Sequence, residues 1–185
     1  MNLKKIIIFG GSGFIGGHFI DFLIKKGCEK IYVADIVENK NLSKLSEVTY
    51  INCDVRKKIN IELLENIDAI FNFAAIHREP GHQGFEYFET NINGAKNICN
   101  FAHKQNCKTI LFTSSISPYG PSEDEKNEHS LPTPETPYGI SKLTAELIHQ
   151  NWQTSSNLNK LVIVRPGVVF GPNENGNMSR LIKAV

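Results

Sequence analysis

Short apolar runs alternate along this chain with longer segments whose apolar residues recur at helical spacing. Strands are predicted at 4–9, 30–35, 48–53, 68–73, 108–114 and 160–164. Between them, helices are predicted at 14–26, 57–65, 84–105 and 138–156. Alternation of this kind is typical of a parallel sheet with helices on both faces. The pattern therefore predicts an α/β fold in which a doubly wound parallel sheet forms the middle of three α/β/α layers.

Three glycines follow the first apolar run, at Gly10, Gly13 and Gly16. A strand, a tight turn and a helix start place backbone N–H groups around one point at the positive end of a helix, which suits a pyrophosphate. We expect Gly10 to permit the turn, Gly13 to let a phosphate approach the backbone, and Gly16 to let helix and strand pack closely. The spacing is one residue looser than G-x-G-x-x-G, so a purely structural turn is the alternative.

An aspartate, Asp35, ends the next apolar run, roughly twenty residues beyond the loop, where a carboxylate can bind an adenosine ribose. A carboxylate also repels a 2′-phosphate, so Asp35 favours NAD over NADP. Its position favours a dinucleotide-binding loop over a structural turn.

A tyrosine and a lysine four residues apart, Tyr138 and Lys142, lie at the start of the last predicted helix. This spacing puts both on one helix face, where the ammonium of Lys142 favours the ionised form of the Tyr138 phenol. Such a phenolate can take a proton from a substrate hydroxyl while hydride leaves the same carbon. Taken alone, the spacing is also that of an ordinary exposed pair on a helix.

A serine-rich segment, Thr113–Gly120, follows the fifth predicted strand. It falls at the carboxyl edge of the sheet, where α/β folds bind ligands. A hydroxyl there can donate to a substrate oxygen and position it for Tyr138. An ordinary serine-rich turn is the alternative.

Together these residues resemble the extended short-chain dehydrogenase/reductase family, in its NAD-dependent epimerase/dehydratase branch. The resemblance extends from the first strand to about residue 172. It is carried, in chain order, by the Gly10–Gly16 loop, Asp35, Cys53-Asp54-Val55, Asn72-Phe73-Ala74-Ala75, Asn91 within Thr90–Gly94, the Ser115 segment, Tyr138 with Lys142, and Arg165-Pro166-Gly167. It implies a Rossmann-type fold, an NAD cofactor and an enzyme.

The resemblance also assigns roles to single residues. It implies that Ser115, Tyr138 and Lys142 are catalytic, and that Lys142 binds the nicotinamide ribose as well. Asp35 would hold the adenosine ribose. The other cofactor contacts would come from Gly10, Gly13, Phe14, Ile15, Gly16, Asp54, Val55, Ala74, Ala75, Asn91, Tyr138 and Pro166. Substrate contacts would come from Ser117, His77 and Arg78, although a solvated loop is the alternative for the last two.

The reaction is a narrower question. Sugar dehydratases of the family usually carry Asp-Glu where this chain has Ile116 and Ser117, so dehydration is disfavoured. The resemblance favours a nucleotide-sugar 4-epimerase that works through a transient ketone. Val168 stands where many nucleotide-sugar enzymes have asparagine, which weakens the sugar assignment. A non-catalytic NAD-binding or sensing module and an NAD(P)-dependent reductase of a non-sugar carbonyl are the alternatives.

The chain of 185 residues suits one NAD-binding domain over 1–170, followed at 171–185 by the start of a substrate-binding region that is cut short. We therefore expect this chain alone to turn over poorly. A net charge of +1 gives no case for a nucleic-acid partner, and no segment is long enough to span a membrane. The four cysteines lack metal-site spacing. A cytoplasmic location is predicted, and the resemblance suggests a homodimer through the helices at 84–105 and 138–156.

Overall fold

The six predicted strands form one sheet. A computed structural model describes residues 3–63, 65–77, 81–172 and 180–181. Within these residues the strands are β1 (Lys5–Phe9), β2 (Lys30–Asp35), β3 (Val48–Asn52), β4 (Ala69–Asn72), β5 (Thr109–Thr113) and β6 (Lys160–Val164). All neighbours pair in parallel, in the order β3-β2-β1-β4-β5-β6. This order, which reverses direction between β1 and β4, is that of a Rossmann fold.

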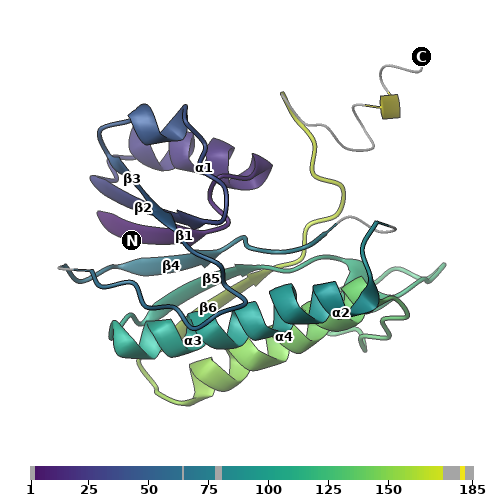
Figure 1. Cartoon of the computed structure of the whole chain (residues 1–185). Helices are drawn as coiled ribbons and strands as arrows, with labels where there is room; N and C mark the ends of the chain where they lie inside the picture. Colours follow the sequence, from purple (N-terminus) through teal and green to yellow (C-terminus); the bar gives the residue numbers. More distant parts are fainter. Residues whose placement is uncertain (1–2, 64, 78–80, 173–179, 182–185) are drawn as a thin grey trace.

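Helices cover both faces of the sheet. They are α1 (Phe14–Lys25), α2 (Gly84–Tyr87), the π-helical η2 (Phe88–Asn93), α3 (Gly94–Lys104) and α4 (Pro137–Thr154), with short 3₁₀ turns η1 (Leu42–Lys44) and η3 (Ser117–Tyr119). α1 lies on one side of the sheet, and α3 and α4 lie on the other (Figure 1). The predicted three-layer doubly wound fold is confirmed. Among the described residues, no helix has the length and apolarity that crossing a membrane requires.

The central strand β1 shows why both faces need a cover. Ile6 and Ile8 pack in a core cluster with Ile20 and Leu23 of α1, whereas Ile7 packs in a second cluster with side chains of α3 and α4. Because successive side chains of a strand point to opposite faces, an all-apolar run such as this one is stable only between two layers.

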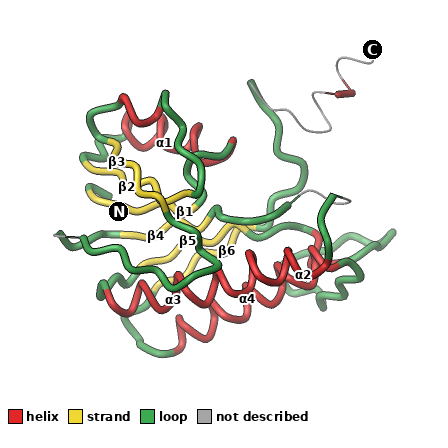
Figure 2. Tube along the Cα trace, in the orientation of Figure 1, coloured by secondary structure: helices red, strands yellow, loops and turns green. Residues whose placement is uncertain are grey.

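The helix predicted at 57–65 is wrong. Residues 57–63 have no helical structure, and the connection between β3 and β4 is drawn as loop in Figure 2. The reason lies in the spacing of its apolar residues, since Ile59, Ile61 and Leu63 all pack against the same core cluster. Positions two apart share a face only when the chain is extended. The period is therefore that of a strand-like segment.

Candidate active site

The turn after β1 is built on backbone contacts that exclude side chains. Gly10 has φ +76°, and a Cβ atom there would lie 2.5 Å from the amide nitrogen of Ala74, just after β4. A Cβ atom on Gly16 would lie 2.5 Å from the carbonyl oxygen of Gly11, so Gly16 packs against the turn itself and not against the strand. A Cβ on Gly13 would meet only the Gly10 carbonyl, at 3.4 Å, an ordinary contact. Packing within the chain therefore requires glycine at 10 and 16.

The start of α1 fits an anionic group such as a pyrophosphate. Its N-cap, Gly13, offers no side chain to the first turn, and that turn carries no acidic residue. The first N–H groups of a helix lack partners within the helix, and the helix dipole adds positive potential. The buried hydroxyl of Ser12 beside them finds no hydrogen-bond partner among the described residues. The N–H groups of the first turn of α1 are therefore available to an anion. Two apolar residues of this first turn, Phe14 and Ile15, are also predicted to contact the cofactor. Phe14 is half-buried, and Ile15 is 36% exposed.

The carboxylate of Asp35 joins the end of β2 to this turn. One oxygen accepts a hydrogen bond from the backbone N–H of Ser12, at 3.0 Å, and the other accepts from Val37, at 3.2 Å. Asp35 is half-buried, so a lone pair on each oxygen can still accept from a ribose hydroxyl. The arrangement suits the ribose contact that was predicted for this residue.

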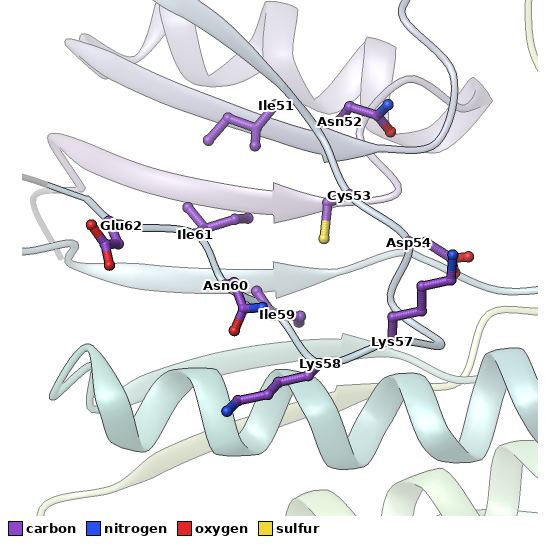
Figure 3. Close-up of a pocket in the computed structure, with 10 residues that line it drawn as sticks. All are labelled: Ile51, Asn52, Cys53, Asp54, Lys57, Lys58, Ile59, Asn60, Ile61 and Glu62. Atoms are coloured by element: carbon purple, nitrogen blue, oxygen red, sulfur yellow. The ribbon is translucent and has the colours of Figure 1, made fainter.

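The predicted adenine side is shaped by an ion pair. Asp54 accepts three hydrogen bonds from the Arg56 side chain, from Nε at 2.9 and 3.2 Å and from Nη2 at 2.8 Å, and this pairing holds the pKa of Asp54 below its usual value. Val55 is buried beneath Gly94. A pocket of about 510 Å³ opens beside them (Figure 3); it is lined by Ile51, Asn52, Cys53, Asp54, Lys57, Lys58, Ile59, Asn60, Ile61 and Glu62. It lies along the extended 57–63 segment, and neither Tyr138 nor Lys142 lines it.

Asn91 lies in the π-helical turn η2 and anchors the segment after β4. Its side-chain oxygen accepts from the N–H of Ile76 at 3.0 Å, and its Nδ2 donates to the Ile76 carbonyl at 3.1 Å. The same Nδ2 donates to Ser141 at 2.8 Å, and the Ser141 hydroxyl in turn donates to the carbonyl of Tyr138 at 2.7 Å. Asn91 therefore ties the Ala74–Ala75 segment to the start of α4. Single-turn π segments are frequent at functional sites.

Tyr138 and Lys142 lie one turn apart on α4, which Thr136 caps by accepting from the N–H of Gly139 at 3.1 Å. Lys142 is buried, and its Nζ donates to the carbonyl of Thr113 at 2.9 Å. That Nζ lies 6.0 Å from the centre of the Tyr138 ring. Burial lowers the pKa of Lys142 to about 7, against the opposing effect of Glu146.

The Ser115 segment packs directly on the start of α4. The Ser115 hydroxyl accepts from the N–H of Ser117 at 3.2 Å, and the two hydroxyls lie 3.1 Å apart. A Cβ on Gly139 would lie 2.8 Å from the Ser117 carbonyl, so only glycine next to Tyr138 permits this approach. The N–H of Ile116 also donates to the carbonyl of Pro166, at 3.2 Å. These contacts bring the Ser115, Tyr138 and Pro166 segments together.

All these segments follow the carboxyl ends of parallel strands, at the edge where open α/β sheets bind ligands. His77 also follows β4 there and is exposed. Arg78 and most of the predicted region at 171–185 lie outside the described residues.

Sequence reasoning missed a set of buried polar side chains beneath Lys142. Glu146 is 1% exposed and forms an ion pair with Arg165, and His149 is fully buried. The His149 Nδ1 donates to the carbonyl of Ala145 at 2.7 Å, so Nε2 accepts from Asn72 at 3.4 Å. The available signal was their spacing: Glu146 and His149 fall on the same helix face as Lys142 and the apolar core residues.

The topology and the glycine turn define a nucleotide-binding domain of the Rossmann class. Within that class, the chain belongs to the NAD dependent epimerase/dehydratase family, whose sequence profile matches residues 6–185.

Similar proteins of this family are named for different reactions, epimerisation and dehydration. The chain is 30% identical, over 98% of its length, to N-acetyl-alpha-D-glucosaminyl-diphospho-ditrans,octacis-undecaprenol 4-epimerase of Escherichia coli O157:H7. It is 28% identical, over 92% of its length, to dTDP-D-glucose 4,6-dehydratase of Homo sapiens. Among solved structures, UDP-glucuronic acid 4-epimerase from Bacillus cereus in complex with NAD aligns over 92% of the chain with a TM-score of 0.80 and 26% identity. The chain spans 54%, 53% and 59% of these proteins, respectively.

Proposed function

We propose that this chain is the NAD-binding part, including the catalytic residues, of a nucleotide-sugar 4-epimerase, with the domain over 1–170. The observation that carries the proposal is the buried Lys142, fixed at the carboxyl edge one helical turn from Tyr138. A relative and a solved neighbour that are both named as 4-epimerases of sugar-diphosphate compounds support the substrate class.

The cofactor would lie across the reversal point between β1 and β4. The N–H groups around Gly13 would hold its pyrophosphate, and Asp35 would hold the adenosine ribose. When bound, NAD supplies an acceptor for hydride from the sugar carbon and then a donor that returns it. The further contacts predicted for Phe14, Ile15, Ala74, Ala75, Asn91 and Pro166 remain part of this proposal.

The chain's own residues would handle the proton. The Tyr138 phenolate would take the proton of the sugar hydroxyl and give it back after the sugar has turned. The Lys142 ammonium would stabilise that phenolate and donate to the nicotinamide ribose. The Ser115 hydroxyl would hold the substrate oxygen, and Ser117, His77 and Arg78 would contact the rest of the substrate.

Epimerisation is favoured over dehydration because the eliminating acid and base are missing from the segment that would carry them. Ile116 and Ser117 occupy the positions after Ser115. Neither side chain can donate and accept a proton near neutral pH, as loss of water requires. A ketone formed at this site would then react further by accepting the hydride back.

We also propose a homodimer through the helices at 84–105 and 138–156, that is, through α2, η2, α3 and α4. These elements contact one another, and they present large apolar side chains to solvent: Phe85 is 60% exposed, Ile140 40% and Leu147 56%. A second copy is the occupant that would cover such a face symmetrically. Sedimentation of the chain would test it. The predicted cytoplasmic location stays a prediction.

Calorimetry tests the cofactor, and turnover tests the reaction. We expect this chain to bind NAD and to prefer it to NADP. We expect the full-length gene product to interconvert the 4-epimers of one sugar within a screen of UDP-, GDP-, CDP- and dTDP-sugars. Tight NAD binding with no turnover of any of them would favour a sensing module, and no NAD binding would overturn the proposal.

A further inference from the structure

A buried carboxylate lies directly beneath the proposed catalytic residues. Glu146 is 1% exposed and follows Lys142 by one turn of α4. One carboxylate oxygen accepts from the Ser114 hydroxyl and from Arg165 Nε, the latter at 2.9 Å, and the other accepts from Arg165 Nη2 at 2.5 Å. The guanidinium also lies over the ring of Tyr119, 4.7 Å from its centre. A two-point Arg–carboxylate pair of this kind is geometrically specific.

These contacts fix the strand that leads into Ser115. Lys142 binds the carbonyl of Thr113, and Glu146 binds the side chain of Ser114, the next residue. The N–H of Ser114 donates to the carbonyl of Val164 at 2.8 Å, one residue before Arg165. Two side chains of one helix therefore hold the last residue of β5 and the residue after it, while the Arg165 side chain connects Glu146 to the end of β6.

We propose that Glu146 and Arg165 are positioning residues of the reaction: they hold Ser115 and Lys142 in register and place a carboxylate one helical turn from the Lys142 ammonium. This inference rests on the proposed function for its catalytic meaning. Neither residue is assigned contact with substrate or cofactor, and their effect passes through Ser114 and Lys142.

The charges around Lys142 explain why the carboxylate matters. The groups around the Lys142 ammonium come from three elements. On α4 they are Tyr138, Glu146 and His149, and at the end of β5 the group is the Thr113 carbonyl. Arg165, just after β6, reaches the carboxylate of Glu146. Within this set, Glu146 is the carboxylate that forms an ion pair with Arg165. Burial disfavours the ammonium, and Glu146 opposes that effect. Without the Glu146 carboxylate, the cationic side chains of Lys142 and Arg165 would lie near each other with no anion from α4 between them.

Glu146→Gln is the sharpest test, because it keeps the shape of the side chain and removes its charge. In this chain, labelled with ¹³C at the lysine side chains, NMR follows the titration of Lys142, identified by the signal lost in Lys142→Met. We expect the Glu146→Gln variant to titrate about one pH unit lower than the wild type. In the full-length gene product we expect kcat to fall about tenfold with little change in KM, and the basic limb of its pH profile to move to lower pH, because the ammonium that stabilises the Tyr138 phenolate is lost earlier.

Asn159→Ala provides the matched control. Asn159 is buried and donates to the carbonyl of Trp152 at 2.8 Å, near the far end of α4. We expect this variant to lose stability while the Lys142 titration stays in place. A Lys142 titration unmoved by Glu146→Gln, or moved equally by Asn159→Ala, would overturn the inference.

A second variant covers the case in which Glu146→Gln fails to fold. Arg165→Lys keeps the charge beside Glu146 but loses the two-point geometry. We expect a fall in kcat with the Lys142 titration nearly unchanged, and wild-type kcat would overturn the positioning role. Because the NMR titration needs no cofactor, a failure to bind NAD in calorimetry would sink the proposed function separately.

Discussion

The candidate site has two halves along the carboxyl edge of the sheet: a backbone half after β1 and β2, and a side-chain half after β5 and β6. After β1 and β2 the site consists mostly of backbone: a glycine turn, the free end of α1, and one carboxylate that binds a backbone N–H. After β5 and β6 it consists of buried side chains that bind one another, centred on Lys142 and Glu146. The first half is indicated by glycine spacing. In the second half the spacing of Tyr138 and Lys142 is visible in the sequence, but the burial of Lys142 and Glu146 is revealed only by the fold.

The largest effect should come from the side-chain half. Tyr138→Phe removes the hydroxyl that we propose moves the proton, so we expect turnover by the full-length gene product to fall by about 10²–10⁴-fold. NAD affinity and stability should hardly change. Tyr32→Phe deletes a phenol hydroxyl that contacts Glu65 instead, at 3.2 Å, and should keep wild-type turnover. Equal activity of the two variants would refute the role of Tyr138.

The backbone half should fail in a different way. Gly10→Ala forces a Cβ atom to within 2.5 Å of a backbone nitrogen at a positive φ. We expect the free energy of unfolding to fall by about 2–4 kcal/mol, together with NAD affinity. Gly17→Ala, in α1 with open space around it, should instead stabilise the chain by up to about 1 kcal/mol. Urea denaturation measures both, and equal effects would contradict the backbone argument.

The buried ammonium should make stability depend on pH. Burial lowers the pKa of Lys142 from 10.5 to about 7. Above pH 7 the unfolded chain keeps this proton and the folded chain releases it, so the free energy of unfolding rises with pH. Between about pH 7 and 8.5 we expect a gain of about 1.5 kcal/mol from this group. Denaturation curves of Lys142→Met should lack that rise, and an unchanged slope would count against a buried charge.

The smallest effect should come from His149, on the acid side. Burial lowers its pKa from 6.5 to about 4, so the unfolded chain binds the proton first as the pH falls. Stability contributed by neutral His149 is therefore lost on acidification, by about 1 kcal/mol between about pH 6 and 5. We expect His149→Gln to flatten this part of the curve. His129→Gln, at an exposed site, should leave it as in the wild type.

The sequence was sufficient for the six strands and for the three-layer fold, whereas the residues assigned to the cofactor stay a prediction. Parallel strands are buried on both faces and read as continuous apolar runs, which is why β1 could be placed nearly to the residue. The 57–65 segment was wrongly predicted as a helix because a short apolar run fits both the helical period of about 3.6 and the strand period of two. Here the apolar residues follow the period of two. The Glu146–Arg165 pair could not be predicted, since residues 19 apart in sequence meet only when β6 joins β5 beside α4.

The placement of Tyr138, Lys142 and Glu146 on one helix has a consequence for how this domain can diversify. Their separation is set by the helical rise, about 5.4 Å per turn, and not by any loop. Insertions and exchanges in the surrounding loops can therefore alter which molecule enters without disturbing the distance between phenol, ammonium and carboxylate. The helix thus fixes the spacing of these three side chains, and changes that alter the bound molecule are confined to the surrounding loops.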